Sequence, residues 1–248
     1  SGESFSLWFS KTHGGISSIS YGQHSIIPNN GDALFDGPAL NILRAFTDND
    51  TRLNGGESLK RGFYDAGLTQ MRAHVRGFEL LETSPHRVRV FVRRHCLGSK
   101  GRGFNHECTY TVYPDGSVHL QNRLEPMGEL PMLPRIGLMM TLAGDLEQLE
   151  WYGRGPHESY PDREAGAAIG RYRGTVAEQY VPYPFPQECG NKEDVRWAAL
   201  TDDVGEGVLF SMDTPLAFSA LRYTPGDLNR SWHTYDLKTL YNINLCVY

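Results

Sequence analysis

The chain lacks several features that would assign a protein to a class at once. No apolar run approaches the about 18 residues that a membrane-spanning helix needs, and no secretory signal is visible. No repeat of solenoid period and no linker rich in proline, serine and glycine divides the 248 residues. Because the chain begins with Ser-Gly and not with Met, we expect it to be a piece of a longer protein.

Cysteine is scarce, with four residues at Cys96, Cys108, Cys189 and Cys246. No two of them have C-x-x-C spacing, which excludes a zinc ribbon and a thioredoxin-type motif. Cys96 and Cys108 fall in neighbouring predicted strands and could face each other. A chain of this length hides roughly 70–75% of its unfolded surface without any covalent staple, so we expect reduced, buried thiols.

Positive charge is in short supply as well. The formal net charge is −5, which argues against nucleic acid as the main partner because phosphate binding needs a basic face. The densest basic cluster, Arg87, Arg89, Arg93 and Arg94, lies in a run that alternates basic with apolar residues. This alternation predicts the solvated face of a sheet.

What the sequence does contain is a succession of short strand-like runs. They are residues 5–10, 15–21, 86–97, 106–113, 117–124, 134–144, 207–212 and 216–223. A turn with Gly14 and Gly15 joins the first two, Pro114-Asp115-Gly116 predicts a hairpin, and the last two are expected to pair with each other. Many short strands with turns between them favour one antiparallel β-sandwich over residues 1–248.

Smaller features lie in the first 70 residues. A polar loop is predicted over 28–32 and a flexible tip over 54–56, and a helix is predicted over 57–70 although two glycines weaken it. Thr47-Asp48-Asn49-Asp50 clusters the oxygen ligands that calcium prefers. The glycine and closing glutamate of the usual calcium loop are missing, so a hydrogen-bonded turn is the preferred interpretation.

The stretch from Trp151 to Trp197 has neither helical nor simple strand periodicity, and it is rich in glycine, proline and tyrosine. A long run without regular pattern inside a compact domain is either disordered or a shaped functional surface. Its aromatic content argues against disorder. We therefore predict ordered loops and short strands held by aromatic packing, with Trp8, Trp151 and Trp197 in the core.

Carboxylates of this stretch are candidates for glycoside hydrolysis, which needs two carboxyl groups about 5 Å or about 6.5–9.5 Å apart. They are Glu158, Asp162, Glu188, Glu193 and Asp194. Loops rich in proline and glycine leave backbone groups unpaired, and carboxylates accept hydrogen bonds from them. We therefore favour structural roles, with Asp162 and Arg163 as an ion pair and Glu158 bonded to loop backbone.

A second set of residues suits contact with a sugar. It consists of Arg154, His157, Glu158, Glu188 and His233. Trp232 and Tyr235 flank the last of these, and flat aromatic faces suit the apolar side of a pyranose. We predict carbohydrate contact for this set, and we expect no catalytic and no metal-binding residue in the chain.

Five segments, in this order, resemble one known family. They are GPALNILRAFTDND (37–50), PRIGL (134–138), WYGRGPHESYPDR (151–163), YVPYPFPQECGN (180–191) and SWHTYDL (231–237). In them the chain resembles the C-terminal domain of the large bacterial beta-galactosidases of glycoside hydrolase family 2, which some species make as a separate small subunit. The resemblance implies an all-β fold, a large antiparallel beta-sandwich (supersandwich) of the galactose-mutarotase-like class.

In that family the catalytic glutamates belong to a separate barrel domain. The resemblance therefore implies a non-catalytic domain that packs on the barrel, shapes the active-site wall and supports subunit packing in an enzyme that hydrolyses beta-galactosides such as lactose. It implies no cofactor in this domain, although the whole enzyme is expected to use Mg and a monovalent cation. It further implies a homo-oligomeric parent in the cytoplasm, or alternatively the periplasm, with no nucleic-acid or membrane partner.

The family's domain also lends the active site an aromatic residue from a segment near its end. This chain stops at Tyr248, before the usual M-G-x-G-G-D stretch, so we expect it to be cut before the family's last strands. The equivalent aromatic residue falls around 241–243. Two alternatives stay open: a carbohydrate-binding module, and an aldose-1-epimerase-like enzyme in which His157 or His233 is the acid and a glutamate is the base.

Overall fold

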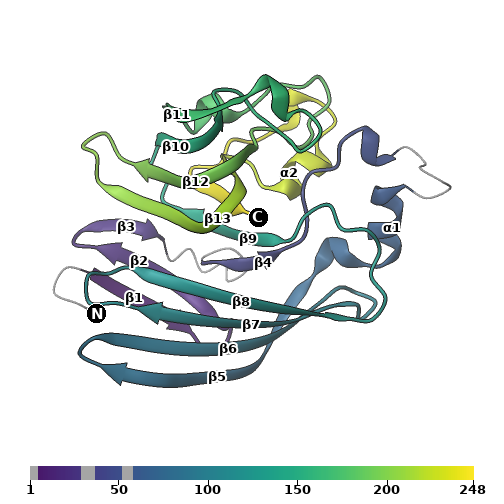
Figure 1. Cartoon of the computed structure of the whole chain (residues 1–248). Helices are drawn as coiled ribbons and strands as arrows, with labels where there is room; N and C mark the ends of the chain where they lie inside the picture. The colour runs from purple at the N-terminus through teal and green to yellow at the C-terminus, as the bar shows by residue number, and fades with distance from the viewer. Residues whose placement is uncertain (1–4, 29–36, 52–57) are drawn as a thin grey trace.

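Antiparallel sheets make up most of the structure. The computed structural model describes residues 5–28, 37–51 and 58–248. Its strands form a three-stranded, a four-stranded and a seven-stranded sheet (Figure 1). The seven-stranded sheet lies at the top of Figure 1, the four-stranded sheet at the bottom, and the three-stranded sheet between them on the left. The expected all-β antiparallel sandwich is confirmed.

The two smaller sheets come from the first half of the chain. The three-stranded sheet has the order β1 (Phe5–Ser10), β2 (Gly15–Tyr21), β3 (His24–Ile27). The four-stranded sheet has the order β5 (Arg72–Ser84), β6 (Arg87–Leu97), β7 (Gly103–Val112), β8 (Val118–Met127). Each strand pairs with the next one along the chain because tight turns connect them. The predicted hairpin turn at 114–116 is one of these, with Gly116 in the left-handed region at φ 87°.

The seven-stranded sheet carries the loops of the central stretch. Its order is β11 (Ala168–Thr175), β10 (Gln148–Gly155), β12 (Lys192–Thr201), β13 (Gly207–Leu221), β14 (Ile243–Val247), β9 (Gly137–Leu142), β4 (Ala39–Asn41). The stretch from 151 to 197 thus supplies parts of three strands and the loops 156–167 and 176–191. This agrees with ordered loops and short strands.

Helices are short and few in the described part of the chain. They are α1 (Leu59–Asp65), α2 (Pro225–Arg230) and the 3-10 turns η1 (Asn49–Thr51), η2 (Leu68–Gln70), η3 (Glu164–Gly166), η4 (Ala177–Gln179) and η5 (Thr234–Asp236). The helix predicted over 57–70 is therefore shorter than expected. Gly67 ends it by adopting left-handed backbone at φ 73°. None of the described helices has the length and apolar character that crossing a membrane requires.

One core joins all three sheets. Ile19 and Ile26 from the small sheet belong to the same buried cluster as Val92 from the four-stranded sheet and Trp151 and Phe218 from the large sheet. Trp151 is 1% exposed, as predicted. Successive strand residues point to opposite faces, so each sheet buries the side chains of one face in this core.

Two predictions about single side chains are wrong because adjacent residues of a strand point to opposite faces of the sheet. Trp8 is 67% exposed, because its neighbour Leu7 points toward the apolar side of β1. Arg94 is buried, although its neighbour Arg93 lies on the solvated face as expected. The guanidinium of Arg94 points inward and donates from Nη2 to the Tyr110 hydroxyl at 3.4 Å. Trp197 is half-buried.

Two further expectations concern the runs of strand β13 and the two polar loops of the N-terminal part. The runs 207–212 and 216–223 do not pair with each other; both lie in the single strand β13, except for Arg222 and Tyr223, which follow it, and β13 pairs with β12 through a register shift. The shift lets the strand continue through Asp213-Thr214-Pro215, which looks like a turn. The tip at 54–56, Glu57 and all of the 28–32 loop except Pro28 lie outside the described residues.

The four cysteines are free and buried, as expected. In the β6–β7 ladder Cys96 lies opposite Phe104 and Cys108 opposite Val92, so the two thiols do not face each other. Burial raises the pKa of both thiols to about 11. They are therefore protonated at neutral pH and serve as small apolar groups.

Replacing Gly14 by alanine is expected to destabilise the protein more than the same change at Gly22. Both glycines have left-handed backbone, with φ +68° and +56°, so both substitutions carry similar strain. A Cβ atom at Gly14 would lie 2.8 Å from methyl groups of Val75 and Val92, whereas one at Gly22 would meet nothing within 4 Å. We expect a loss of about 1 kcal/mol for Gly22→Ala and about 2–4 kcal/mol for Gly14→Ala in urea denaturation. Equal losses would contradict the packing of this turn against β5 and β6.

Candidate functional site

A hollow of about 900 Å³, here called the main hollow, opens where segments far apart in the sequence meet. Its wall comes from Arg44, 47–50, 134–136, 160–163, Gln187, Glu188, Asn191 and Glu193, with Tyr183, Ala217 and Tyr248. Tyrosine, arginine, amide and carboxylate side chains line it, so it offers many hydrogen-bonding groups. Its volume lies in the range of sites for small ligands.

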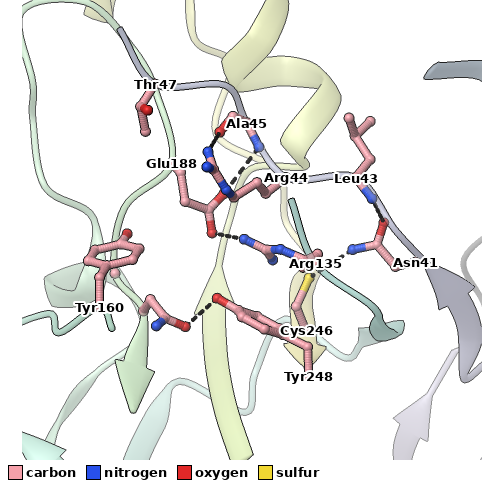
Figure 2. A network of polar contacts seen from close by, with 12 residues as sticks. Asn41, Leu43, Arg44, Ala45, Thr47, Arg135, Tyr160, Glu188, Cys246 and Tyr248 are labelled. Atoms are coloured by element: carbon pink, nitrogen blue, oxygen red, sulfur yellow. Dashed lines mark hydrogen bonds and ion pairs between the residues drawn. The ribbon is translucent and has the colours of Figure 1, made fainter. Parts of the chain in front are cut away.

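An ion pair between Arg135 and Glu188 is buried beneath this hollow (Figure 2). The exposed fractions of the two side chains are 2% and 4%. The other carboxylate oxygen of Glu188 accepts from the backbone N–H of Ala45 at 3.1 Å, and the Arg135 guanidinium lies 4.0 Å from the centre of the Tyr248 ring. Burial lowers the pKa of Arg135, but Glu188, Tyr248 and Cys246 together raise it above its ordinary value. The pair is a structural tie between the two segments.

Tyr248 completes this network from the end of β14. Its hydroxyl donates to the side-chain carbonyl of Asn191. Its ring covers Arg135 (Figure 2). Burial raises the pKa of Tyr248 well above its usual value. The phenol is therefore a neutral hydrogen-bonding wall residue.

The segment 47–50 forms a hydrogen-bonded turn, as preferred from the sequence. Asp50 accepts from the backbone N–H of Thr47 at 2.8 Å and from Arg44 Nη2 at 2.9 Å. The carboxylate is thus neutralised by a guanidinium, which does not suit a calcium ligand. Across the described ranges, no three His, Cys, Asp or Glu side chains are grouped as a metal site.

Glu158 lies at a smaller hollow of about 540 Å³ that also contains His157. Its carboxylate pairs with Arg163, accepts from the Tyr183 hydroxyl and accepts from the backbone N–H of Gly190 at 2.7 Å. The predicted bond from Glu158 to loop backbone is confirmed. The predicted pairing of Arg163 with its neighbour Asp162 is wrong, because the loop turns Arg163 toward Glu158.

Arg154 ties down the loop that follows β10. Its Nε donates to Asp194 at 2.7 Å, and its Nη1 donates to the carbonyl oxygens of Glu164 and Ala167 at 3.2 and 3.1 Å. Nη2 pairs with the Glu164 carboxylate at 3.0 Å. Four of its five N–H groups are engaged, so this side chain mainly shapes the loop.

The two histidines of the predicted set lie at the surface. His157 is exposed at the smaller hollow. His233 stacks on Tyr235 with the ring centres 4.8 Å apart, and its Nδ1 lies 3.5 Å from Asp236. Trp232 beside it is 72% exposed and meets Phe185 edge-on.

The five predicted site residues are therefore distributed over several places. Glu188 borders the main hollow, His157 and Glu158 border the smaller one, and Arg154 and His233 border neither. Carbohydrate contact through them stays a prediction.

Three contributors to the main hollow were not singled out in the sequence: Arg44, Arg135 and Tyr248. Arg135 could have been noticed in the sequence, because it is the one charged residue in the otherwise apolar segment PRIGL (134–138). No local signal exists for Tyr248, because only the fold brings the end of β14 to the entry of β9.

Asp162 and Glu193 border the main hollow and form no ion pair with another described residue. Asp162 is exposed, and Glu193 is half-buried and accepts from the Asn191 side chain at 2.6 Å. Burial raises the pKa of Glu193, although the bond from Asn191 lowers it. Together with the free Gln187 amide, these groups suit hydrogen bonding to a polyhydroxylated ligand.

A buried lysine lies beneath the same loops. Lys192 is 2% exposed, its ammonium donates to the carbonyl of Gly190 at 3.2 Å, and it lies 5.2 Å from the centre of the Trp151 ring. Burial lowers the pKa of Lys192 to about 8, although Glu158 raises it. Part of this lysine is therefore neutral in mildly alkaline solution.

The solved structure of a galactose mutarotase-like protein from Lactobacillus casei matches this architecture. The TM-score is 0.50, and the match covers 100% of this chain and 85% of that chain. At 12% sequence identity the match shows the fold alone, and it confirms the expected galactose-mutarotase-like class.

A family model described as beta galactosidase small chain matches residues 1–248. The chain therefore belongs to the beta-galactosidase small chain family, as its motifs indicated. A beta-galactosidase of Halalkalibacterium halodurans is 32% identical over 97% of this chain, and one of Bifidobacterium adolescentis is 30% identical over 92%. The chain spans only 23% and 21% of those proteins. A beta-galactosidase of Priestia megaterium is 45% identical over 52% of this chain and 12% of its own length.

Glu188→Gln is expected to destabilise the protein by about 3–5 kcal/mol, because it leaves the buried Arg135 charge without a counter-charge. Glu125→Gln is the matched control. Glu125 pairs with Arg123 at 2.7 Å, but both side chains are more than half exposed. Its loss should cost less than about 1 kcal/mol in urea denaturation. Similar losses for the two variants would show that the Arg135–Glu188 pair is not the tie described above.

Lys192→Met should change how stability depends on pH. The folded protein holds Lys192 with a pKa of about 8, below the 10.5 of a free lysine, so the unfolded chain binds more protons between these values. The stability of the wild type should therefore rise relative to Lys192→Met from pH 8 to 10, by up to about 1.4 kcal/mol per pH unit. The difference between the two proteins is the quantity to measure, because the buried cysteines titrate in the same window with opposite sign. A constant difference would contradict a buried, partly neutral lysine.

Proposed function

We propose that this chain is a non-catalytic C-terminal domain of a beta-galactosidase, which hydrolyses terminal beta-galactosides such as lactose. In this proposal the domain packs beside the catalytic barrel of the same enzyme, forms part of the wall of the sugar site and supports subunit packing. Mg and a monovalent cation would bind in other domains. The parent enzyme would be a homo-oligomer in the cytoplasm.

One observation carries the non-catalytic part. Each well-buried carboxylate at the two hollows of the described structure is neutralised by an arginine: Glu188 by Arg135, Glu158 by Arg163 and Asp50 by Arg44. Each of the three also accepts a hydrogen bond from a loop backbone N–H group, that of Ala45, Gly190 and Thr47 respectively. These carboxylates are therefore suited to holding loops.

The wall role is supported by polar side chains of the main hollow that form no ion pair with another described residue. Gln187, Asp162 and Glu193 can bond sugar hydroxyls. Sugar contact without turnover, as in a carbohydrate-binding module, is the second candidate function, and these same groups favour it.

Reconstitution tests the proposal. The isolated chain should fold and fail to hydrolyse a nitrophenyl galactoside, whereas co-expression with the remaining part of the parent enzyme should give turnover. Titration of the isolated chain with galactose reports direct sugar contact, and millimolar saturable binding lost in Gln187→Ala would favour the second candidate.

Turnover by the isolated chain that disappears in Glu193→Gln or Asp162→Asn would overturn the non-catalytic assignment. Gln121→Ala is the matched control, because Gln121 lies on the exposed face of β8, away from both hollows.

A further inference from the structure

An apolar groove lies between the three-stranded and four-stranded sheets, away from both hollows. Its volume is about 920 Å³. Leu7 and Phe9 from β1 line it together with Phe78 and Leu80 from β5. The rings of Phe9 and Phe78 meet edge-on with centres 6.2 Å apart, and Leu80 is 62% exposed. The groove thus reaches the core, and the apolar side chains that line it are not covered by other described residues.

Both strands that supply these side chains are edge strands. In the described sheets β1 and β5 are the terminal strands of their sheets, so one side of each has no strand neighbour. The strand β5 is 13 residues long, and Leu81 next to Leu80 is also 46% exposed. A long edge with exposed leucines is a template for another strand, and proteins usually cover such an edge.

The charges at the groove have one sign. Lys11 and Arg87 are the charged residues among its described lining, and no acidic residue borders it. Arg87 is held by Glu82 at 2.9 Å, whereas Lys11 is exposed. A chain of net charge −5 therefore presents a local positive end here, which suits a carboxylate on the occupant.

We propose that the apolar groove receives an extended segment from another domain of the same beta-galactosidase. The segment would add a strand to the free edge of β5, place an apolar side chain against Leu80 and bring a carboxylate to Lys11. This inference rests on the proposed function and names the surface through which the domain is held.

The lengths of the relatives support this occupant over a second copy of the chain. More than three quarters of the Halalkalibacterium protein lies outside the matched region. A domain of the same polypeptide binds at high effective concentration, so one added strand suffices. A free second copy would have to supply a standard interface of roughly 1,200–2,000 Å².

Co-expression of the tagged chain with the remaining part of the enzyme tests the inference, and Leu80→Asp is the decisive variant. Leu209→Asp is its matched control, because Leu209 is also 62% exposed and also lies on a strand, β13. We expect Leu80→Asp to weaken association at least about 10-fold and Lys11→Glu about 3-fold, with Leu209→Asp unchanged. Hydrogen exchange of amides in 78–84 should slow when the complex forms.

Each outcome separates the two proposals. If the wild-type chain neither associates nor restores turnover, the proposed function is wrong. If it associates and Leu80→Asp behaves like Leu209→Asp, only the groove assignment is wrong. If Leu80→Asp does not fold by circular dichroism, Lys11→Glu and the exchange of 78–84 decide. A dimer of the isolated chain that Leu80→Asp dissociates, with association to the rest of the enzyme intact, would replace the proposed occupant by a second copy.

Discussion

The arrangement of the loops depends on the buried ion pair of Arg135 and Glu188. Through it the entry to β9 is joined to the loop before β12, and the bond from Ala45 adds the segment after β4 (Figure 2). Two charges in so dry a place are stable only as a pair, since each alone would cost several kcal/mol of desolvation. The three segments therefore hold their positions together, and the main hollow exists because they do.

Other arginine side chains hold loops around the hollows in a similar way. Arg163 holds Glu158 and Arg44 holds Asp50, while Arg154 collects two carbonyl oxygens of its own loop. Loops with many prolines and glycines cannot form ladders, so side chains must satisfy their backbone groups. The consequence is chemical as well as structural, because the oxygens of these acids are engaged by guanidinium and backbone N–H groups.

The sequence predicted strands best where alternation and turn residues agree. The bounds of β1 and β2 are those of the strand-like runs 5–10 and 15–21. The strand β13 was divided in two because Asp213-Thr214-Pro215 imitates a turn, and β10 to β12 were hidden because glycine and arginine interrupt their apolar pattern. Which acid pairs with which arginine was out of reach, since Glu188 and Arg135 are brought together only by the path of the fold. The adjacent Asp162 was the wrong partner to assign to Arg163 for the same reason.

The polar hollows and the apolar groove differ in whether another domain is needed to cover them. The β5–β6 turn beside the groove lies at the left of Figure 1, and the segment after β4 that borders the main hollow lies at the right. A domain of this size can bury enough surface to fold by itself. The uncovered leucines of an edge strand are different, because in isolation they invite non-specific pairing. Dependence on the parent enzyme should therefore be concentrated at the groove, while the paired charges leave the main hollow preformed.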